Sequence, residues 1–248
     1  MTYLGFLCVF LGIPIGIMAG LVYRSRLPHK KTTVWGITTL TALAVLYTTP
    51  WDNYLVANEV WWYGKDRVLG VIGHVPIEEY MFFVLQTVLT GIWCYLLQSR
   101  IKLVKTANNT ILKKWVGALY GALFIFGLAC LTQNNYLYLG LILSWAMPIL
   151  IFQWFMGGQY IVKNYKFFIV SVLVPSFYLW FADAFAIWDN IWTISERFTV
   201  GVSIGNLPIE EAIFFFVTNL MVAQGLILFI TMEEEVQTVL ALKRKWFN

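Results

Sequence analysis

Charged residues are scarce in this 248-residue chain. They make up 12% of it, whereas 60% of the residues are hydrophobic and 18% are aromatic. An ordinary soluble domain contains about a quarter charged residues. Several apolar runs of transmembrane length follow one another here, with only short polar breaks between them. The composition therefore excludes an ordinary soluble domain and predicts an integral membrane protein.

The residue types that serve metal and cofactor chemistry are also few. Two histidines cannot furnish a histidine-rich di-iron site, and the three cysteines, Cys8, Cys94 and Cys130, show no metal-binding spacing. The last apolar run contains no lysine to carry a retinal Schiff base. No glycine-rich dinucleotide fingerprint or phosphate loop occurs. We therefore expect neither a metal site nor a cofactor.

The net charge of +4 does not indicate a nucleic-acid partner. The lysines and arginines lie in loops beside apolar runs rather than on one face studded with aromatic residues. Anionic lipid headgroups explain such positions better. We expect membrane lipids as partners and no nucleic acid.

The apolar runs predict an all-α protein with seven transmembrane spans, eight being the alternative count. The spans are expected near residues 3–23, 34–50, 76–97, 115–131, 136–156, 167–187 and 208–232. Seven spans put 14 of the 17 lysines and arginines on the side of the C-terminal tail and 3 on the other side. The positive-inside rule then predicts a multi-pass protein of the cytoplasmic membrane, with its N-terminus outside and its C-terminus in the cytoplasm.

Two sequence elements occur twice in the same order. One is a Trp-Asp-Asn tripeptide, and the other is a Pro-Ile-Glu-Glu tetrapeptide followed at a short distance by two phenylalanines. The repeated positions are Trp51, Asp52 and Asn53 with Trp188, Asp189 and Asn190, and Pro76, Glu78, Glu79, Phe82 and Phe83 with Pro208, Glu210, Glu211, Phe214 and Phe215. The offset is 137 for the first element and 132 for the second, which predicts five extra residues around 63–68 in the first copy.

The duplication predicts two parallel three-helix repeats. Residues 1–107 form the first repeat with spans one to three, residues 108–134 form a connector span, and residues 135–248 form the second repeat with spans five to seven and a cytoplasmic tail. Matching spans are four apart, so both copies have the same orientation and are related by a pseudo-twofold axis along the membrane normal.

The Pro-Ile-Glu-Glu segments permit two interpretations. Proline and carboxylates both favour a helix N-terminus, so the segments could be helix starts and nothing more. However, consecutive helical residues point about 100° apart, so one glutamate of each doublet must turn away from water. Ionisable groups at such depth are costly and usually functional. The catalytic candidates are therefore Glu78, Glu79, Glu210 and Glu211, which could hold protons if they are buried together.

The repeated neighbours are candidates for supporting roles. Asp52, Asn53, Asp189 and Asn190 could hydrogen-bond the glutamates, while aromatic rings could bind substrate or stabilise a cation. The aromatic candidates are Trp51, Trp188, Phe82, Phe83, Phe214 and Phe215.

Each of these groups also has an ordinary explanation. An interfacial aromatic belt would explain Trp51, Trp61, Trp62, Trp188 and Trp192 equally well. Glu59 and Glu196 could be solvated loop charges. Asp183 lies inside span six without a match in span two, and a structural hydrogen bond explains it as well as catalysis does.

The paired Trp-Asp-Asn and Pro-Ile-Glu-Glu elements resemble those of the membrane-integral lycopene cyclases, which occur as heterodimers in some bacteria and as fused two-half proteins elsewhere. The chain looks like the fused form over nearly its whole length. The resemblance implies cyclisation of the acyclic ψ-ends of lycopene to β-ionone rings, giving β-carotene via γ-carotene without redox change. It places the catalytic carboxylates after Pro76 and Pro208. It also implies lycopene, other acyclic carotenoids and other carotenoid-pathway enzymes as partners.

The expected mechanism is acid–base catalysis. A proton adds to the terminal double bond, the ring closes through a tertiary cation, and a ring proton leaves. One glutamate would donate, and a carboxylate of the other half would stabilise the cation or accept the departing proton. Which proton leaves decides between β, ε and γ rings, and the sequence does not settle that choice.

Two other functions compete with this interpretation. Parallel repeats with intramembrane carboxylates also suit a proton-coupled transporter of a small or hydrophobic molecule. A membrane prenyltransferase would need aspartates that hold Mg²⁺ and diphosphate, and only Asp183 and Asp189 approach such a cluster.

Overall fold

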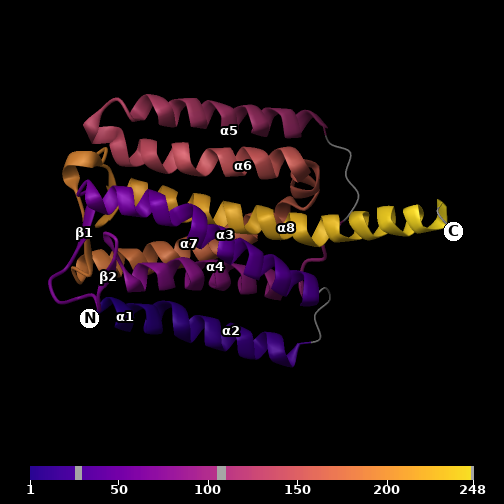
Figure 1. Cartoon of the computed structure of the whole chain (residues 1–248), viewed down its shortest axis with the longest axis horizontal. Coiled ribbons are helices and arrows are strands. Elements are labelled where there is room, and N and C mark those ends of the chain that lie inside the picture. Colours follow the sequence, from indigo (N-terminus) through magenta and orange to yellow (C-terminus); the bar gives the residue numbers. More distant parts are fainter. Residues whose placement is uncertain (26–29, 105–109, 247–248) are drawn as a thin grey trace.

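Long helices make up most of the chain. The computed structural model describes residues 1–25, 30–104 and 110–246, with the backbone alone at 110 and 233–246. The helices lie roughly side by side along one direction (Figure 1). Their bounds are α1 Tyr3–Phe6, α2 Ile13–Arg24, α3 Lys30–Ala57, α4 Ile77–Leu97, α5 Thr110–Cys130, α6 Leu137–Lys163, α7 Tyr165–Trp188 and α8 Ile209–Trp246. The π-helical turn Leu7–Gly12 joins α1 to α2, and two 3-10 turns span Asn134–Tyr136 and Glu196–Phe198.

Six helices of the described part are long and apolar enough to cross a membrane. They are Tyr3–Arg24, Ile77–Leu97, Ile111–Cys130, Asn134–Lys163, Tyr165–Trp188 and Ile209–Met232. The chain is therefore a helical membrane protein. Helix α3 is not one of the six, because its 28 residues begin with two lysines and include seven threonines. It nevertheless packs against α4 and α8, and the predicted count of seven spans depends on it.

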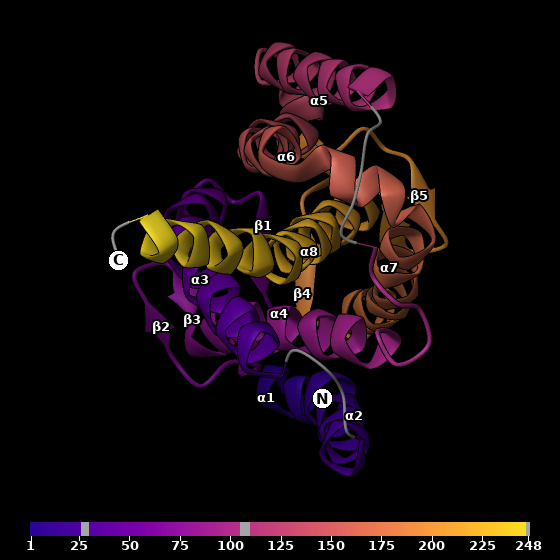
Figure 2. The ribbon, with the colours of Figure 1, turned by 90° about the vertical axis from the view of Figure 1, so that its right-hand side faces the viewer.

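Helix α5 lies at the edge of the bundle. It packs against α6, on the side of the molecule opposite α1 and α2 (Figure 2). Its neighbours leave most of its apolar surface exposed. Helix α5 thus covers α6 without entering the space where α3, α4, α7 and α8 meet. The predicted boundary between the first repeat and the connector, at 107 and 108, lies outside the described residues, as do 247 and 248 of the predicted tail.

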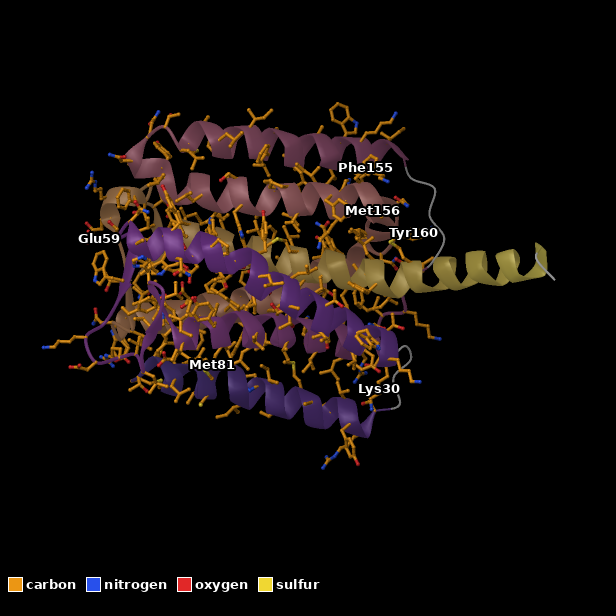
Figure 3. All side chains as sticks on the ribbon, in the orientation of Figure 1. Lys30, Glu59, Met81, Phe155, Met156 and Tyr160 are labelled. Carbon is orange, nitrogen blue, oxygen red and sulfur yellow. The ribbon has the colours of Figure 1, made fainter. Side chains whose placement is uncertain are left out.

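Short β-ribbons add a feature that the all-α prediction did not contain. Three two-stranded antiparallel ribbons form, from β1 Trp61–Tyr63 with β4 Trp192–Ile194, β2 Val71–Ile72 with β3 Val75–Pro76, and β5 Ser203–Ile204 with β6 Leu207–Pro208. They lie at the end of the bundle where α4 and α8 begin, here called the ribbon end (Figure 1). Glu59 is at this end and Lys30 is at the opposite one (Figure 3).

One of the ribbons joins the two halves of the chain. In the ribbon β1–β4, Trp61 pairs with Ile194, Trp62 with Thr193 and Tyr63 with Trp192. The other two ribbons are the turns that lead into α4 and α8. Each contains a glycine in the left-handed region, Gly73 with φ 68° and Gly205 with φ 66°, a conformation that favours glycine.

The second Trp-Asp-Asn sequence does not occupy the structural position of the first. Asp52 lies five residues before Ala57, the last residue of α3, whereas Asp189 lies just beyond the end of α7 at Trp188. The residue that lies five positions before the end of α7 is Asp183. The structural offset is therefore 131, and the pairing of Asp52 with Asp189 is wrong.

The segments that follow the two helices agree with this offset. Glu59 and Asn190, 131 residues apart, both adopt a left-handed backbone, with φ of 57° and 54°. Strands β1 and β4 then begin at Trp61 and Trp192, again 131 apart. The five extra residues predicted around 63–68 are absent, and the stretch from β1 to β2 is one residue shorter than that from β4 to β5. The prediction misplaced the second copy because it matched the identical tripeptides, whereas the structure matches the ends of α3 and α7.

Buried polar side chains tie α4, α7 and α8 together in the middle of the bundle. The Asn219 Oδ1 atom accepts hydrogen bonds from Gln86 Nε2 at 3.2 Å and Thr90 Oγ1 at 2.6 Å, and Asn219 Nδ2 donates to Ser176 Oγ at 3.0 Å. Interhelical hydrogen bonds of this kind stabilise helix contacts in membranes, where apolar packing gives little preference for protein over lipid. They fix the relative positions of the helices that carry the two glutamate doublets.

Candidate active site

A cavity of about 40 Å³, here called the carboxyl cavity, lies at the ribbon end of the bundle. Four carboxyl side chains from four helices line it, namely Asp52 from α3, Glu79 from α4, Asp183 from α7 and Glu211 from α8. The rest of its wall is almost entirely aromatic, made by Tyr3, Trp51, Trp61, Tyr63, Phe82, Phe83, Tyr138, Trp192, Ile194, Phe214 and Phe215.

The carboxyl cavity contains carboxyl groups but no cationic side chain among the described residues. Among the described residues that line it there is no lysine, arginine or histidine. A buried anion is costly unless it is paired or hydrogen-bonded. Carboxyl groups that share a site without a cation share protons instead, as in carboxylate dyads. The cavity can therefore hold exchangeable protons in an apolar setting.

The two glutamates of each doublet point to different places. Glu79 and Glu211 line the carboxyl cavity. Glu78 and Glu210 are fully buried and instead bind the loop that precedes their own helix. Glu78 Oε1 accepts from the Leu69 amide at 2.8 Å, and Glu210 Oε1 accepts from the Val200 amide at 2.6 Å.

This divergence follows from the rotation of about 100° between consecutive helical residues. The helix-start interpretation therefore describes the first glutamate of each doublet, which fixes the loop. The second glutamate of each doublet is the one that lines the carboxyl cavity.

Phenol groups hold the two cavity glutamates in place. Tyr3 Oη donates to Glu79 Oε2 at 2.6 Å, and Tyr63 Oη donates to the same oxygen at 3.1 Å. Tyr138 Oη donates to Glu211 Oε1 at 2.6 Å. Burial raises the pKa of the Tyr63 phenol well above its usual value, and the nearby Glu79 and Asp52 raise this pKa further. Tyr63 is therefore a protonated donor throughout the physiological pH range.

The two aspartates present unpaired oxygens. Asp183 Oδ1 accepts from Trp192 Nε1 at 2.9 Å. The second oxygen of Asp183 and the Oδ2 atom of Asp52 are buried, and neither has a hydrogen-bond partner among the described residues. An unsatisfied buried acceptor costs about 1–3 kcal/mol, more if it is charged. Such oxygens are suited to bind a proton or a positive centre that enters the cavity.

Aromatic rings of one half pack against aromatic rings of the other half at the carboxyl cavity. Tyr3 packs edge-on against Trp192, with ring centroids 5.1 Å apart, and Tyr138 packs edge-on against Trp61, with centroids 5.4 Å apart. Trp51 lies nearly parallel to Phe214 at 5.7 Å. The electron-rich faces of such rings attract cations. A carbocation formed in this cavity would be surrounded by aromatic rings and carboxyl oxygens.

Several of the predicted site residues lie elsewhere. Trp188 is 71% exposed. The carboxyl cavity is lined by none of the three residues Trp188, Asp189 and Asn190. Asp189 pairs with the Met1 amino group and with Arg67. The hydrogen bond from the amino group, followed by its charge and that of Arg67, lowers the pKa of Asp189, which is therefore a carboxylate at neutral pH. These three residues do not support the glutamates as expected, because Trp188 is the last residue of α7 and the other two follow the helix.

The first-copy asparagine and the two prolines shape the turns. Asn53 Oδ1 accepts from the His74 amide at 2.9 Å and so fixes the turn between β2 and β3. Pro76 pairs with Val71 in that ribbon, and Pro208 pairs with Ser203 in the equivalent one. They position the helix starts without lining the carboxyl cavity.

Comparison with known proteins identifies the family. The sequence pattern of the family described as Lycopene cyclase matches residues 1–97 and 135–229. The chain belongs to the lycopene cyclase family. The stretch between the two matched blocks contains α5, the peripheral helix.

Individual lycopene cyclases are similar over most of the chain. The lycopene beta-cyclase of Halobacterium salinarum is 42% identical over 230 residues, which cover 92% of this chain and 95% of the relative. The bifunctional lycopene cyclase/phytoene synthase of Aspergillus niger is 38% identical over 199 residues, which cover 76% of this chain and 34% of the relative. The corresponding bifunctional protein of Gibberella fujikuroi is 34% identical over 226 residues, covering 87% of this chain and 38% of the relative. No solved structure matches the chain.

For a lycopene cyclase, sequence reasoning missed part of the cavity wall. It left the role of Asp183 open and did not single out Tyr3, Tyr63 or Tyr138. An alignment of the two halves by helix ends would have matched Asp183 with Asp52 and Trp192 with Trp61. The tyrosines carry no local signal, because the elements that bring them to the glutamates are far apart in the sequence.

Proposed function

We propose that this protein is a lycopene cyclase that converts the acyclic ψ-end groups of lycopene into β-ionone rings and so makes β-carotene. The observation that carries the proposal is the carboxyl cavity itself, where Asp52, Glu79, Asp183 and Glu211 meet within aromatic walls. The 42% identity to a lycopene beta-cyclase supports it and favours cyclisation over transport or prenyl transfer.

The reaction needs one proton in and one proton out. Addition of a proton to the terminal double bond gives a tertiary cation, and the electrons of a second double bond then close the ring and move the cation onto a ring carbon. Loss of a neighbouring proton forms the ring double bond. No electrons are gained or lost overall, so an acid and a base suffice.

Glu211 is the proposed proton donor and Glu79 the proposed acceptor. Two phenols donate to one oxygen of Glu79, whereas a single phenol donates to Glu211. Hydrogen bonds donated to a carboxylate favour its charged form. Glu79 is thereby suited to take up the ring proton, and Glu211 to begin the cycle as the acid.

The aspartates and aromatic rings carry the cation between these two steps. The free oxygens of Asp52 and Asp183 give electrostatic stabilisation where positive charge develops, which is commonly a large contribution to catalysis. Trp51 and Phe214 supply ring faces beside them. The same carboxyl groups can return the accepted proton to Glu211 for the next turnover.

Both doublets serve one site in this proposal. Glu79 and Glu211 line the same cavity, so a single end group occupies it at a time. The two ends of lycopene are then cyclised in succession, with monocyclic γ-carotene as the intermediate. Other acyclic carotenoids with a ψ-end would be accepted, and other enzymes of the carotenoid pathway would supply and remove them.

The proposed architecture is a pair of parallel repeats in a seven-span protein. Residues 1–107 and 135–248 are the repeats, residues 108–134 are the connector, and α3 is the seventh span. The spacing of 131 to 132 residues between equivalent strands and helix starts supports a pseudo-twofold relation. The N-terminus lies outside and the C-terminus in the cytoplasm of the cytoplasmic membrane, with the carboxyl cavity toward the outer face.

Expression in cells that accumulate lycopene tests the function. The extracted pigment, resolved by chromatography, is expected to change from lycopene to β-carotene, with γ-carotene appearing first in a time course. A transporter would leave the lycopene uncyclised, and that result would overturn the proposal.

A further inference from the structure

A second cavity of about 180 Å³, here called the apolar cavity, adjoins the carboxyl cavity. Phe82, Phe83 and Phe214 line both cavities, so three phenyl rings form the partition between them. No charged side chain lines the apolar cavity within the described residues. It extends from the carboxyl groups toward the middle of the bundle, between α3, α4, α6 and α8.

The apolar cavity is open toward the surrounding lipid beside α3. Leu43 and Tyr47, both in its wall, are 55% and 40% exposed, and the adjacent Leu46 is 72% exposed. Large apolar side chains that are exposed on a membrane helix face lipid. A hydrophobic molecule could thus pass from the bilayer into the cavity without crossing water.

Contacts between α3 and α6 frame this opening. Tyr47 Oη donates to the Trp145 carbonyl at 2.9 Å, and the two rings stack with centroids 5.7 Å apart. Nearer the ribbon end, Trp51 Nε1 donates to the Leu141 carbonyl at 3.1 Å. These contacts close the α3–α6 gap beside the carboxyl groups and leave the wall at Leu43 to face the bilayer.

We propose that the apolar cavity binds the polyene chain of the carotenoid whose end group occupies the carboxyl cavity, and that this chain enters sideways between α3 and α6. The inference rests on the proposed cyclase function. An end group among the four carboxyl groups must be continued by an apolar chain, and the shared phenyl rings lead directly into the apolar cavity. A volume of about 180 Å³ holds only the part of a C40 chain nearest the reacting end.

The far part of the chain then lies in the bilayer. The enzyme would recognise one ψ-end and the polyene next to it, and would be indifferent to the other end. The substrate class is therefore any long carotenoid with one free ψ-end, whether its other end is acyclic, cyclised or substituted.

Filling the apolar cavity tests the proposal. Ala44 lies in its wall on α3, and Ala42 lies on the same helix but is exposed and outside the wall. Ala44→Phe and Ala42→Phe are made in a Glu211→Gln background, so that bound lycopene is not consumed. Each protein is purified from lycopene-accumulating cells, and the carotenoid retained per protein is measured by absorbance.

Ala44→Phe is expected to reduce the retained lycopene at least about tenfold, as is typical when a binding pocket loses the space for its ligand. Ala42→Phe is expected to retain it within about twofold, as for a surface substitution. Ile149→Phe fills the cavity from α6 and is expected to act like Ala44→Phe, which covers the case in which Ala44→Phe does not fold.

Retention of lycopene by both cavity-filling variants would overturn the proposal, because binding would then not need the space in the apolar cavity. An equal loss in Ala42→Phe would overturn it too, because the loss would not depend on the cavity. Failure of the cyclase proposal is distinguishable, since it is read from the pigment made by the unaltered protein and not from binding.

Discussion

Glu79 and Glu211 start equivalent helices, yet their surroundings differ by one phenol. Tyr3 and Tyr63 both donate to Glu79, while Tyr138 alone donates to Glu211. The residue of β4 at the position of Tyr63 in β1 is Ile194, and both side chains line the carboxyl cavity. A site built from two similar halves would otherwise present two similar acids. This single difference gives the two glutamates unequal hydrogen bonding, and acid–base catalysis requires such inequality.

The largest expected effect is the loss of the proton donor. Glu211→Gln removes the acid that starts the reaction, so we expect lycopene to remain uncyclised and the cyclisation rate to fall about 10²- to 10⁴-fold. Pigment extracted from lycopene-accumulating cells measures this. The matched control is Glu196→Gln, which alters an exposed glutamate and should keep the rate within about twofold. Normal β-carotene from Glu211→Gln would eliminate the assigned donor.

Loss of the proton acceptor should change the products as well as the rate, unlike loss of the donor. Glu79→Gln leaves the donor in place, so the cation still forms but loses its proton to a different base. We expect a rate lower by about 10²-fold together with ring isomers other than β, resolved by chromatography. If Glu79→Gln and Glu211→Gln gave the same pigments in the same proportions, the division of roles between the two glutamates would be wrong.

The two aspartates of the second half should contrast with each other. Asp183→Asn removes a carboxyl oxygen from the cavity but keeps an acceptor for Trp192, so we expect at least about a tenfold loss of rate through weaker electrostatic stabilisation. Asp189→Asn changes an ion pair outside the cavity and should stay within about twofold. The opposite ranking would mean that Asp189, and not Asp183, supports the reaction.

The smallest effect should come from the extra phenol. Tyr63→Phe removes one hydrogen bond to Glu79 and leaves that from Tyr3, which corresponds to about 0.5–1.5 kcal/mol, or about a two- to tenfold loss of rate. A small rise in rings other than β should accompany it. Tyr54→Phe, at an exposed position of α3, is the control. An unchanged rate and product pattern in Tyr63→Phe would mean that this phenol does not distinguish the two glutamates.

Some features of the molecule were predictable from the sequence because they depend on local patterns. Apolar runs of membrane length predicted the positions of the six apolar helices, and the Pro-Ile-Glu-Glu segments predicted the starts of α4 and α8. The prediction that at least one glutamate of each doublet turns inward follows from helix geometry alone. In the structure three of the four glutamates are buried and Glu79 is half-buried, and the two glutamates of each doublet contact different neighbours.

Other features could not be read from local patterns. The predicted equivalence of the two halves depended on three identical residues, Trp-Asp-Asn, that occur in both. The structural equivalence is instead a carboxyl group placed five residues before a helix end, as at Asp52 and Asp183. Tyr3 and Tyr138 reach glutamates 76 and 73 residues away, a distance over which sequence spacing carries no information without a fold. Identical letters were therefore a weaker guide than equivalent positions in helices.

A double-mutant cycle tests the central claim that Glu79 and Glu211 act together in one site. The rates of Glu79→Gln, Glu211→Gln and the double variant are compared with that of the unaltered protein, in purified enzyme supplied with lycopene. Groups that act as a unit have strongly non-additive effects. Our account predicts that the double variant is no slower than the slower single variant by more than about threefold. The account would be contradicted if the rate loss of the double variant equalled the product of the two single losses. It would also be contradicted if each single variant still completed one ring per lycopene at the normal rate. Either result would show two independent sites.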